Sequence, residues 1–335
     1  MAILVTGGAG YVGSHVVRHL VEKGHEVVVL DNLSTGHRQA VQEGAEFIWG
    51  DVGDEELVDS IFRQFSIEGV IHLAGNSVPC ESLTNPMKYF ENNLVKGMRL
   101  ARSMIKYRVK HIVFSSTAAV YGNFKQELVT EDSPSCPGDV MGESMLMFER
   151  MLDWLYRLHG IRYVILRYYN AAGAHPAGDI GEDHRPETHL IPMALQTVLG
   201  QRQRFTIFGD NHATIDGTCL RDYVHVCDVA SAHALALEYL VYEKGLPRIY
   251  NVSTGCGYTV GQVVRTVEEV TGRRVNCTVS PRREEDPSIL VASGERIRKE
   301  LGWKPCLSDL NSIVTTAWNW HRNNPCGYGT AVEEI

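Results

Sequence analysis

Three glycines near the start of the chain have the spacing of a loop that binds phosphate. Gly7, Gly10 and Gly13 follow the apolar residues 2–5, which are typical of a central parallel strand. The first glycine of such a loop permits a tight turn, the second lets the backbone approach a pyrophosphate, and the third lets the next helix pack on the strand. Asp31 follows the second strand, where a carboxylate accepts hydrogen bonds from an adenosine ribose and repels a 2′-phosphate. The pattern predicts NAD rather than NADP, and a loop that binds no ligand is the alternative.

Other polar or small residues follow the later strands. Asp51 can bond the adenine amino group, or it can cap the helix of residues 54–65. Asn92 and Asn93 interrupt a helical pattern, and one of them either faces the cofactor or satisfies the backbone of a neighbouring strand. The predicted cofactor residues from the pattern alone are Gly7, Gly10, Tyr11, Val12, Gly13, Asp31, Asn32, Asp51, Val52, Leu73, Ala74, Gly75, Asn92 and Ser115.

These residues need a scaffold in which strands and helices alternate. Hydrophobic patterns predict helices near 14–23, 54–65 and 86–107. They predict strands near 2–5, 25–30, 45–49, 70–73, 110–116 and 161–167. This order predicts an α/β fold with a Rossmann-type doubly wound parallel sheet, in which ligands sit at the carboxyl ends of the strands.

Composition narrows the class of protein. The chain has 335 residues, is 44% apolar and carries a net charge of -8 without a basic block. We therefore expect neither nucleic acid nor a membrane surface as a partner. No apolar run approaches the roughly twenty residues of a membrane span, and Met1 leads directly into a strand, so we expect a cytoplasmic protein.

The cysteines argue against metal and disulfide frameworks. The eight cysteines lie far apart and form no C-x-x-C pair. We therefore predict no metal site and no disulfide scaffold, and we expect most of these residues to be buried thiols.

The order of motifs resembles the extended short-chain dehydrogenases. The chain reads TGGAGYVG at the N-terminus, LAGNS after the fourth strand, SSTAAVYG after the fifth, and then LRYYNAAGAHP and RDYVHV. GEDHRPETHLIP, DGTCLRDYVHVCDVASAH and LGWKP resemble the UDP-glucose 4-epimerase group specifically, and the similarity covers essentially the whole chain. It implies NAD as cofactor, a UDP-sugar as substrate and a homodimer. It also implies an NAD-binding domain at 1–168 and a smaller mixed α/β lobe for the sugar nucleotide at 169–335, with the chain partly crossing back.

The same resemblance assigns roles to residues along the chain. Thr117 would bond the reacting oxygen of the sugar, and Tyr168 would pack by the nicotinamide, although core packing is the alternative for the Tyr168 segment. Asn170 and Arg221 would bond the diphosphate, as would Arg283, while Asp286 would bond the uridine ribose. The remaining residues expected around the sugar nucleotide are His189, Leu190, Phe208, which would cover uracil, and Tyr223.

Two methionines depart from the family pattern. In this family a Tyr and a Lys, four positions apart on one helix, take the proton of the sugar hydroxyl and keep the phenolate ionised. Met141 and Met145 stand at these positions. A thioether neither accepts nor donates a proton at neutral pH, so neither residue is a general base.

Three interpretations of these two methionines remain open. The chain is an inactive form of an epimerase, or it uses another base, or it is a sugar-nucleotide sensor without catalysis. Candidates for another base are Cys136, Asp139, Glu143 and His175. A 4,6-dehydratase is a weaker reading, because Ala118 and Ala119 follow Thr117 where those enzymes carry an Asp-Glu pair.

Overall fold

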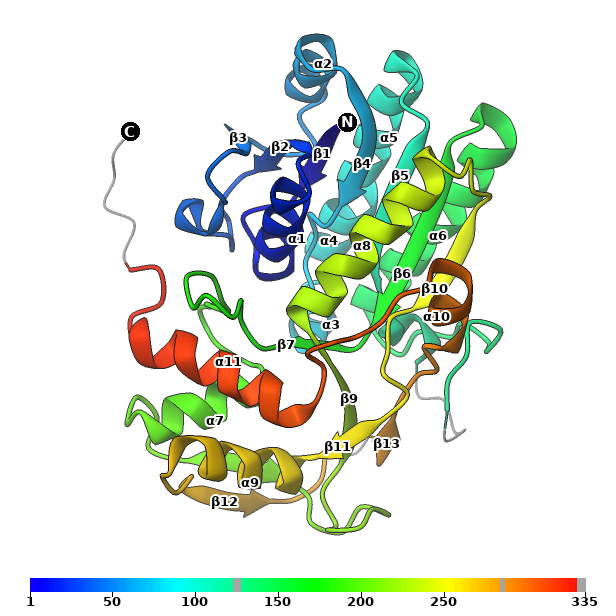
Figure 1. Ribbon diagram of the computed structural model, residues 1–335. Coiled ribbons are helices and arrows are strands. Elements are labelled where there is room, and N and C mark those ends of the chain that lie inside the picture. Colours follow the sequence, from blue (N-terminus) through cyan, green and yellow to red (C-terminus); the bar gives the residue numbers. More distant parts are fainter. Residues whose placement is uncertain (123–127, 284–286, 330–335) are drawn as a thin grey trace.

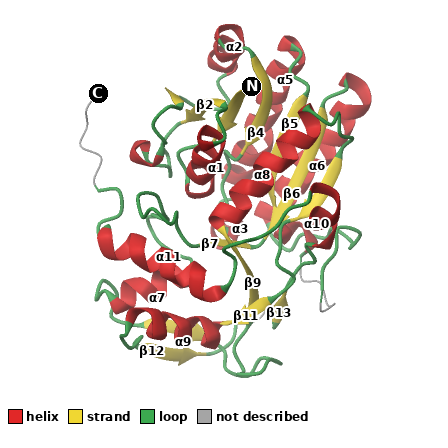
Figure 2. Cartoon of the chain, in the orientation of Figure 1, coloured by secondary structure: helices red, strands yellow, loops and turns green. Residues whose placement is uncertain are grey.

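The computed structural model describes residues 1–122, 128–283 and 287–329. A large parallel sheet with helices on both faces forms one part of the molecule, and a smaller lobe lies below it (Figure 1 and Figure 2).

The large sheet has seven strands in the order β10-β6-β5-β4-β1-β2-β3, and all neighbouring strands are parallel. Its strands are β1 (Ala2–Thr6), β2 (Glu26–Asp31), β3 (Glu46–Trp49), β4 (Ile67–His72), β5 (His111–Thr117), β6 (Arg162–Tyr168) and β10 (Arg248–Asn251). Strands β2 and β3 extend the sheet to one side of β1, whereas β4, β5 and β6 extend it to the other. The order therefore reverses between β1 and β4, where doubly wound folds bind their ligands.

Helices cover both faces of this sheet. α1 (Tyr11–Glu22) and α8 (Val226–Val241) pack together on one face, over a core that contains Val5, Val29 and Leu237. α2 (Glu55–Gln64), α5 (Lys96–Tyr107) and α6 (Val140–His159) lie on the other, over Leu4, Val70 and Phe148. This arrangement confirms the predicted α/β fold.

The segment predicted as one helix over residues 86–107 is divided into three. α3 (Pro79–Thr84) precedes α4 (Pro86–Tyr89), a π-helix spans Phe90–Val95, and α5 completes the segment. A π-helix widens the turn locally, and such segments occur often at functional sites. The sequence pattern did not distinguish this wider turn from an ordinary α-helix.

The smaller lobe has its own core and two small sheets. One sheet combines β7 (Asn170–Ala172), β9 (Leu220–His225), β11 (Gly257–Thr259) and β13 (Ile289–Leu290), and the other pairs β8 (Phe205–Phe208) with β12 (Cys277–Ser280). α7 (Leu190–Val198), α9 (Val260–Thr271) and α11 (Leu310–Asn323) pack over Leu195, Val263 and Ile313. α10 (Glu295–Leu301) lies against β10. Both α8 and β10 come from residues after 168 and complete the first part of the molecule.

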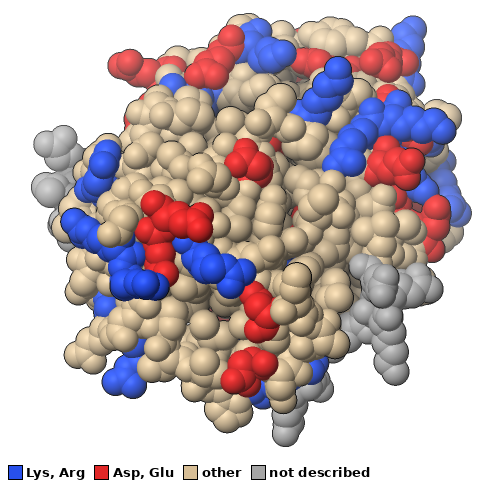
Figure 3. Space-filling model, turned by 60° about the horizontal axis from the view of Figure 1, so that its bottom comes forward, with Lys and Arg blue, Asp and Glu red and all other residues tan. Residues whose placement is uncertain are grey.

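Three expectations from the sequence concern membrane spans, surface charge and the burial of the cysteines. Within the part of the chain that the structure describes, no helix is long and apolar enough to cross a membrane. On the face shown in Figure 3, acidic and basic side chains are interspersed rather than gathered by sign. The expectation of buried cysteines was wrong, because Cys80, Cys136, Cys256, Cys306 and Cys326 are exposed and the other three are half-buried. Most of the exposed thiols lie in loops or at helix ends, where burial is incomplete.

Candidate functional site

A cleft of about 950 Å³ lies at the carboxyl edge of the large sheet and is closed on its other side by residues of the smaller lobe. This volume is near the upper end of the range for ligand pockets. The sequence-predicted residues that line it are Gly7, Gly10, Tyr11, Val12, Gly13, Asp31, Asn32, Asp51, Val52, Leu73, Ala74, Gly75, Asn92, Ser115, Thr117, Met141, Met145, Tyr168, Asn170, His189, Arg221 and Arg283.

The glycine loop is shaped by its close contacts. Gly7 has a φ of 74°, and a Cβ there would lie 2.6 Å from the backbone nitrogen of Ala74. A Cβ at Gly13 would overlap the carbonyl oxygen of Gly7. Gly10, in contrast, faces the cleft, and a Cβ there would approach only that same carbonyl, at 3.4 Å. Its missing side chain therefore leaves space in the cleft, which fits a phosphate group against the backbone.

Helix α1 begins directly after this loop. None of the described side chains caps its first turn, and its first three residues line the cleft. The free amides and the positive end of the helix dipole suit an anion. The Tyr11 hydroxyl donates a 2.6 Å hydrogen bond to the carbonyl of Gly173 and so joins this helix to the loop after β7.

Asp31 lies at the end of β2 and is almost completely buried. Its Oδ2 accepts a hydrogen bond from the backbone nitrogen of Ala9, and its Oδ1 accepts one from Leu33. Burial raises the pKa of this carboxyl, and the two backbone donors partly offset that effect. The carboxylate both holds the glycine loop and faces the cleft.

Asp51 does not cap the following helix, so that alternative was wrong. Asp54 is the N-cap of α2, because its side chain accepts from the backbone nitrogen of Leu57. Asp51 instead accepts from Lys96 Nζ at 2.7 Å and from Asn32 Nδ2 at 2.8 Å. Burial raises the pKa of Asp51, but the bonds from Lys96, Gly53 and Asn32 outweigh burial and lower it. The charged pair lines the cleft at the end of β3.

The two asparagines of the π-helix have separate tasks. Asn92 lines the cleft. Asn93 is buried, accepts from the backbone nitrogen of Asn76 at 2.7 Å, and donates to the Asn76 carbonyl and to Ser144 Oγ. Asn93 therefore fixes the loop after β4 and ties it to α6.

The carboxyl end of β5 places hydroxyl groups beside the cleft. Ser115 Oγ and the Tyr168 hydroxyl lie 2.5 Å apart. Burial raises the pKa of Tyr168 to about 12, so its phenol stays protonated near neutral pH. Thr117 Oγ1 accepts from the backbone nitrogen of Ala119 and keeps its own hydroxyl proton available.

Helix α6 packs against the turn that follows β5 and presents Met141 and Met145 to the same cleft. Asp139 caps the helix by accepting from the Gly142 nitrogen at 2.7 Å. The exposed fractions of Met141 and Met145 are only 4% and 8%, and Met145 belongs to the core under α6. The sulfur-bearing side chains thus close this wall of the cleft with apolar surface.

Only one of the four candidates for another base lines the cleft. Asp139 does so, but its carboxylate already caps α6. Cys136 and Glu143 are not among the lining residues, and His175 Nδ1 lies 3.6 Å from Asp179, outside the cleft.

The smaller lobe contributes cationic and polar groups. Arg221 and Arg283 line the cleft, and the Asn170 side chain donates to the Asp222 carbonyl at 2.8 Å. The Arg283 guanidinium lies over the Phe208 ring at 4.0 Å, although Phe208 is not itself a lining residue. Leu190 and Tyr223 pack in the core of the lobe rather than in the cleft wall. Asp286 lies outside the described residues.

The structure adds residues to the site that the sequence did not single out. Lys96, His184 and Thr188 line the cleft. Lys96 follows Asn92 by four positions, and this helical spacing could have identified it. His184 and Thr188 lie in an irregular loop, where no periodic pattern applies.

His184 and His189 share two buried carboxylates, Glu182 and Glu187. Burial lowers the pKa of both histidines, but the two carboxylates outweigh it and raise the pKa of His184 to about 9 and that of His189 to about 10. In the absence of another cation, both rings carry a positive charge at neutral pH.

Comparison with known proteins gives a consistent group of relatives. Residues 3–253 match the sequence model of the NAD dependent epimerase/dehydratase family. The chain is 48% identical, over 98% of its length and 98% of the relative, to the UDP-glucose 4-epimerase of Halalkalibacterium halodurans.

Solved structures agree with this similarity. A crystal structure of a UDP-glucose 4-epimerase superposes with a TM-score of 0.97 at 45% identity and covers 98% of this chain and 100% of that one. The Bifidobacterium longum UDP-glucose 4-epimerase, crystallised with NAD+ and UDP, gives a TM-score of 0.91 at 34% identity over 98% and 100% of the two chains.

Proposed function

The chain belongs to the NAD dependent epimerase/dehydratase family and, within it, to the UDP-glucose 4-epimerases, and from this membership we propose that its cleft holds NAD beside a UDP-hexose. The reaction class is isomerisation at C4 of the hexose. The observation that carries the proposal is the single cleft that joins the glycine loop to Thr117, Arg221 and Arg283.

The cofactor half of the cleft fits NAD. Gly10 leaves room for a pyrophosphate at the start of α1, and Asp31 offers a carboxylate to the adenosine ribose. Bound NAD would supply the hydride acceptor for C4 of the sugar. Asp51 and Lys96 would hold the adenine end, and Tyr168 would pack at the nicotinamide end.

The substrate half fits a uridine diphosphate. Arg221 and Arg283 provide guanidinium groups, which bind two phosphate oxygens at once. Asn170 and His189 add polar groups from the same lobe, and Thr117 would bond the reacting hydroxyl. The Bifidobacterium longum relative was crystallised with UDP, which supports the same ligand here. We also propose that the chain forms a homodimer and acts in the cytoplasm.

We infer that Met141 and Met145 occupy the positions of the family's Tyr and Lys. Their spacing on α6 and their place in the wall of the cleft that Thr117 also lines support this inference. The chain then lacks the phenol that takes the hydroxyl proton and the ammonium that keeps it ionised. Removing a positioned acid-base group lowers the rate roughly 10²–10⁴-fold. Both ligands would bind, and conversion would be slow.

Turnover of UDP-galactose tests this proposal. We expect the Met141→Tyr, Met145→Lys double variant to convert UDP-galactose at least about a thousandfold faster than the unmodified chain. Met141→Phe with Met145→Leu is the matched control, since it changes the same positions without adding an acid-base group, and it should stay slow.

Equal turnover by the unmodified chain and the double variant would contradict the assignment of the methionines and indicate another base. Asp139→Asn would then be the first substitution to assay, followed by Cys136→Ser and Glu143→Gln. If neither protein binds UDP or NAD in calorimetry, the proposed ligands themselves are wrong.

A further inference from the structure

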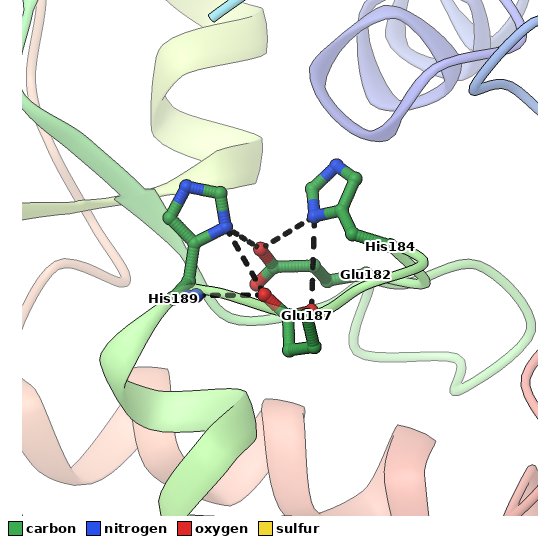
Figure 4. Close-up of side chains that lie close together, drawn as sticks. All are labelled: Glu182, His184, Glu187 and His189. Carbon is green, nitrogen blue, oxygen red and sulfur yellow. Dashed lines mark hydrogen bonds and ion pairs between the residues drawn. The ribbon is translucent and has the colours of Figure 1, made fainter. Parts of the chain in front are cut away.

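Four side chains in the loop between β7 and α7 converge on one point. Glu182, His184, Glu187 and His189 direct their polar atoms toward one another, as Figure 4 shows. One ligand atom from each lies within 4.8 Å of all the others. The exposed fractions of Glu182 and Glu187 are 3% and 6%, so two carboxylates are held almost out of water. Buried carboxylates are retained where a cation compensates them.

The separations lie on both sides of the spacing in the coordination shell of a small ion, and the contact between His189 and Glu182 is the shortest of them. His184 Nδ1 lies 3.1 Å from Glu182 Oε1 and 3.7 Å from Glu187 Oε2. His189 Nδ1 lies 2.6 Å from Glu182 Oε1 and 3.3 Å from Glu187 Oε1. A tetrahedral zinc ion with ligand distances of about 2.0–2.2 Å spaces neighbouring ligands about 3.3–3.6 Å apart. Small rotations of the side chains would bring all four into range.

One carboxylate oxygen of the cluster accepts no hydrogen bond from the described residues and has only a long ion-pair contact with His184. Glu187 Oε1 accepts hydrogen bonds from the backbone nitrogens of Thr188 and His189, both at 2.7 Å. Glu187 Oε2 is buried and accepts none from the described residues. The nearest imidazole nitrogen, His184 Nδ1, is 3.7 Å away and too distant for a hydrogen bond. An unpaired buried carboxylate oxygen is costly, and a bound cation would satisfy it.

The surroundings hold the ligands in place and leave a route to solvent. Trp320 Nε1 donates to the Glu182 carbonyl at 3.1 Å and so fixes that backbone. A second cavity of about 350 Å³ is lined by Glu182, His184 and Glu187. His184 lines both cavities, and the His189 side chain is 44% exposed. Ordered ligands with access from solvent are what a metal site requires.

We propose that Glu182, His184, Glu187 and His189 bind a divalent transition-metal ion of the zinc class. Zinc accepts both imidazole and carboxylate ligands. The two carboxylates carry two negative charges and the ion carries two positive charges, so the occupied site is neutral. All four ligands come from the protein, so the ion is structural. It ties down the loop that brings Thr188 and His189 to the cleft wall. We predicted no metal site from the spacing of the cysteines, and this cluster contains no cysteine.

Zinc binding to the purified chain tests the proposal independently of any catalysis. After treatment with a chelator, the chain should take up one zinc ion per molecule. At a hundredfold excess of zinc over the dissociation constant, its melting temperature should rise by about 4 °C. Glu187→Gln should weaken zinc binding at least about a hundredfold. His175→Asn is the matched control, because His175 lies earlier in the same loop beside Asp179 and outside the four ligands.

Three results would overturn the proposal. Chelator-treated protein that takes up no zinc would show that the cluster is held together by protons alone. Equal zinc affinity of Glu187→Gln and the unmodified chain would place the ion elsewhere. Cobalt added to the unmodified chain gives a further measurement if the variant does not fold. The visible absorption of a four-coordinate site without sulfur-to-cobalt bands supports these ligands, whereas six-coordinate spectra or thiolate bands exclude them.

Discussion

The backbone N–H of Ala9 donates a 2.9 Å hydrogen bond to Asp31 Oδ2, so the glycine loop and the acid at the end of β2 are held as one unit. The other oxygen of the same carboxylate holds Leu33. A ribose bound at Asp31 would therefore sit on a group whose position is already fixed. This pre-organisation reduces the entropy lost on binding.

We predict that Asp31→Asn lowers NAD affinity about tenfold or more and narrows the preference for NAD over NADP. The amide loses the charge that strengthens a hydrogen bond to ribose and repels a 2′-phosphate, and hydrogen bonds to charged groups are worth about 1.5–3 kcal/mol. Calorimetric titration of the dinucleotide-free protein measures both affinities. Asp54→Asn is the control, since Asp54 only caps α2 and Asn is an equally good cap. Unchanged selectivity in Asp31→Asn would place the ribose elsewhere.

We predict that UDP stabilises the chain and that Arg283→Gln removes most of this effect. At a concentration one hundred times its dissociation constant, UDP should raise the melting temperature by about 4 °C. Loss of the guanidinium should reduce UDP affinity about tenfold to a hundredfold. Arg322→Gln serves as control, because Arg322 also lies over an aromatic ring, that of Trp318, but does not line the cleft. An unchanged melting temperature with millimolar UDP would count against the sugar-nucleotide ligand.

We predict that Asp222→Asn becomes increasingly stabilising as the pH rises. Burial raises the pKa of Asp222 to about 7, although Ser253 and the Ala292 nitrogen bond its Oδ2, and its Oδ1 accepts no bond from the described residues. The folded chain thus keeps a proton that the unfolded chain releases near pH 4. The free energy of unfolding falls from about pH 4 to pH 7 through this group, and falls no further above that range.

Urea unfolding at pH 5 and at pH 8 measures this effect as a difference between the two proteins. The advantage of Asp222→Asn over the unmodified chain should grow by about 2 kcal/mol between these values. Asp210→Asn is the control, because Asp210 is exposed, and its difference in unfolding free energy from the unmodified chain should not change with pH. A constant difference would mean that Asp222 is ionised throughout.

The sequence predicted the parts of the site whose signals are local. The glycine loop and Asp31 lie within one strand, helix and strand, so their spacing specifies their arrangement. Asn92 and Asn93 were both noticed, but only the wider π-helical turn decides which faces the cleft and which bonds Asn76. The seventh strand, β10, joins β6 after a long return of the chain, and no local pattern predicts that pairing.

Glu182, His184, Glu187 and His189 show why the sequence did not predict other parts of the site. They lie close in sequence, but their spacing fits neither a helical nor a strand period, so periodicity gives no reason to bring them together. The path of the loop, the indole of Trp320 and the helix start at Leu190 position them. Such convergence depends on tertiary contacts between distant segments.

The last prediction concerns the ion pair beneath the methionines. Arg167 donates two hydrogen bonds to the Glu149 carboxylate, from Nε to Oε1 at 3.0 Å and from Nη2 to Oε2. Ser116 Oγ also donates to Oε1, at 2.5 Å. Both charged side chains are almost fully buried. Met141, Met145 and Glu149 follow one another at intervals of four on α6 and so share one face of the helix. The pair therefore anchors the face that presents the two methionines to the cleft.

We predict that Glu149→Gln lowers the free energy of unfolding by about 3–5 kcal/mol, because it leaves the Arg167 guanidinium buried without a counter-charge. Glu149→Leu combined with Arg167→Met should cost clearly less than the sum of the single changes, since neither charge is then left alone. Urea unfolding with a constant m-value measures the losses. Glu143→Gln in the first turn of the same helix is the control and should cost less than about 1 kcal/mol. If the free energy of unfolding of Glu149→Gln lies within about 1 kcal/mol of the value for the unmodified chain, the pair does not anchor α6. Core packing alone would then hold the methionines in the cleft wall.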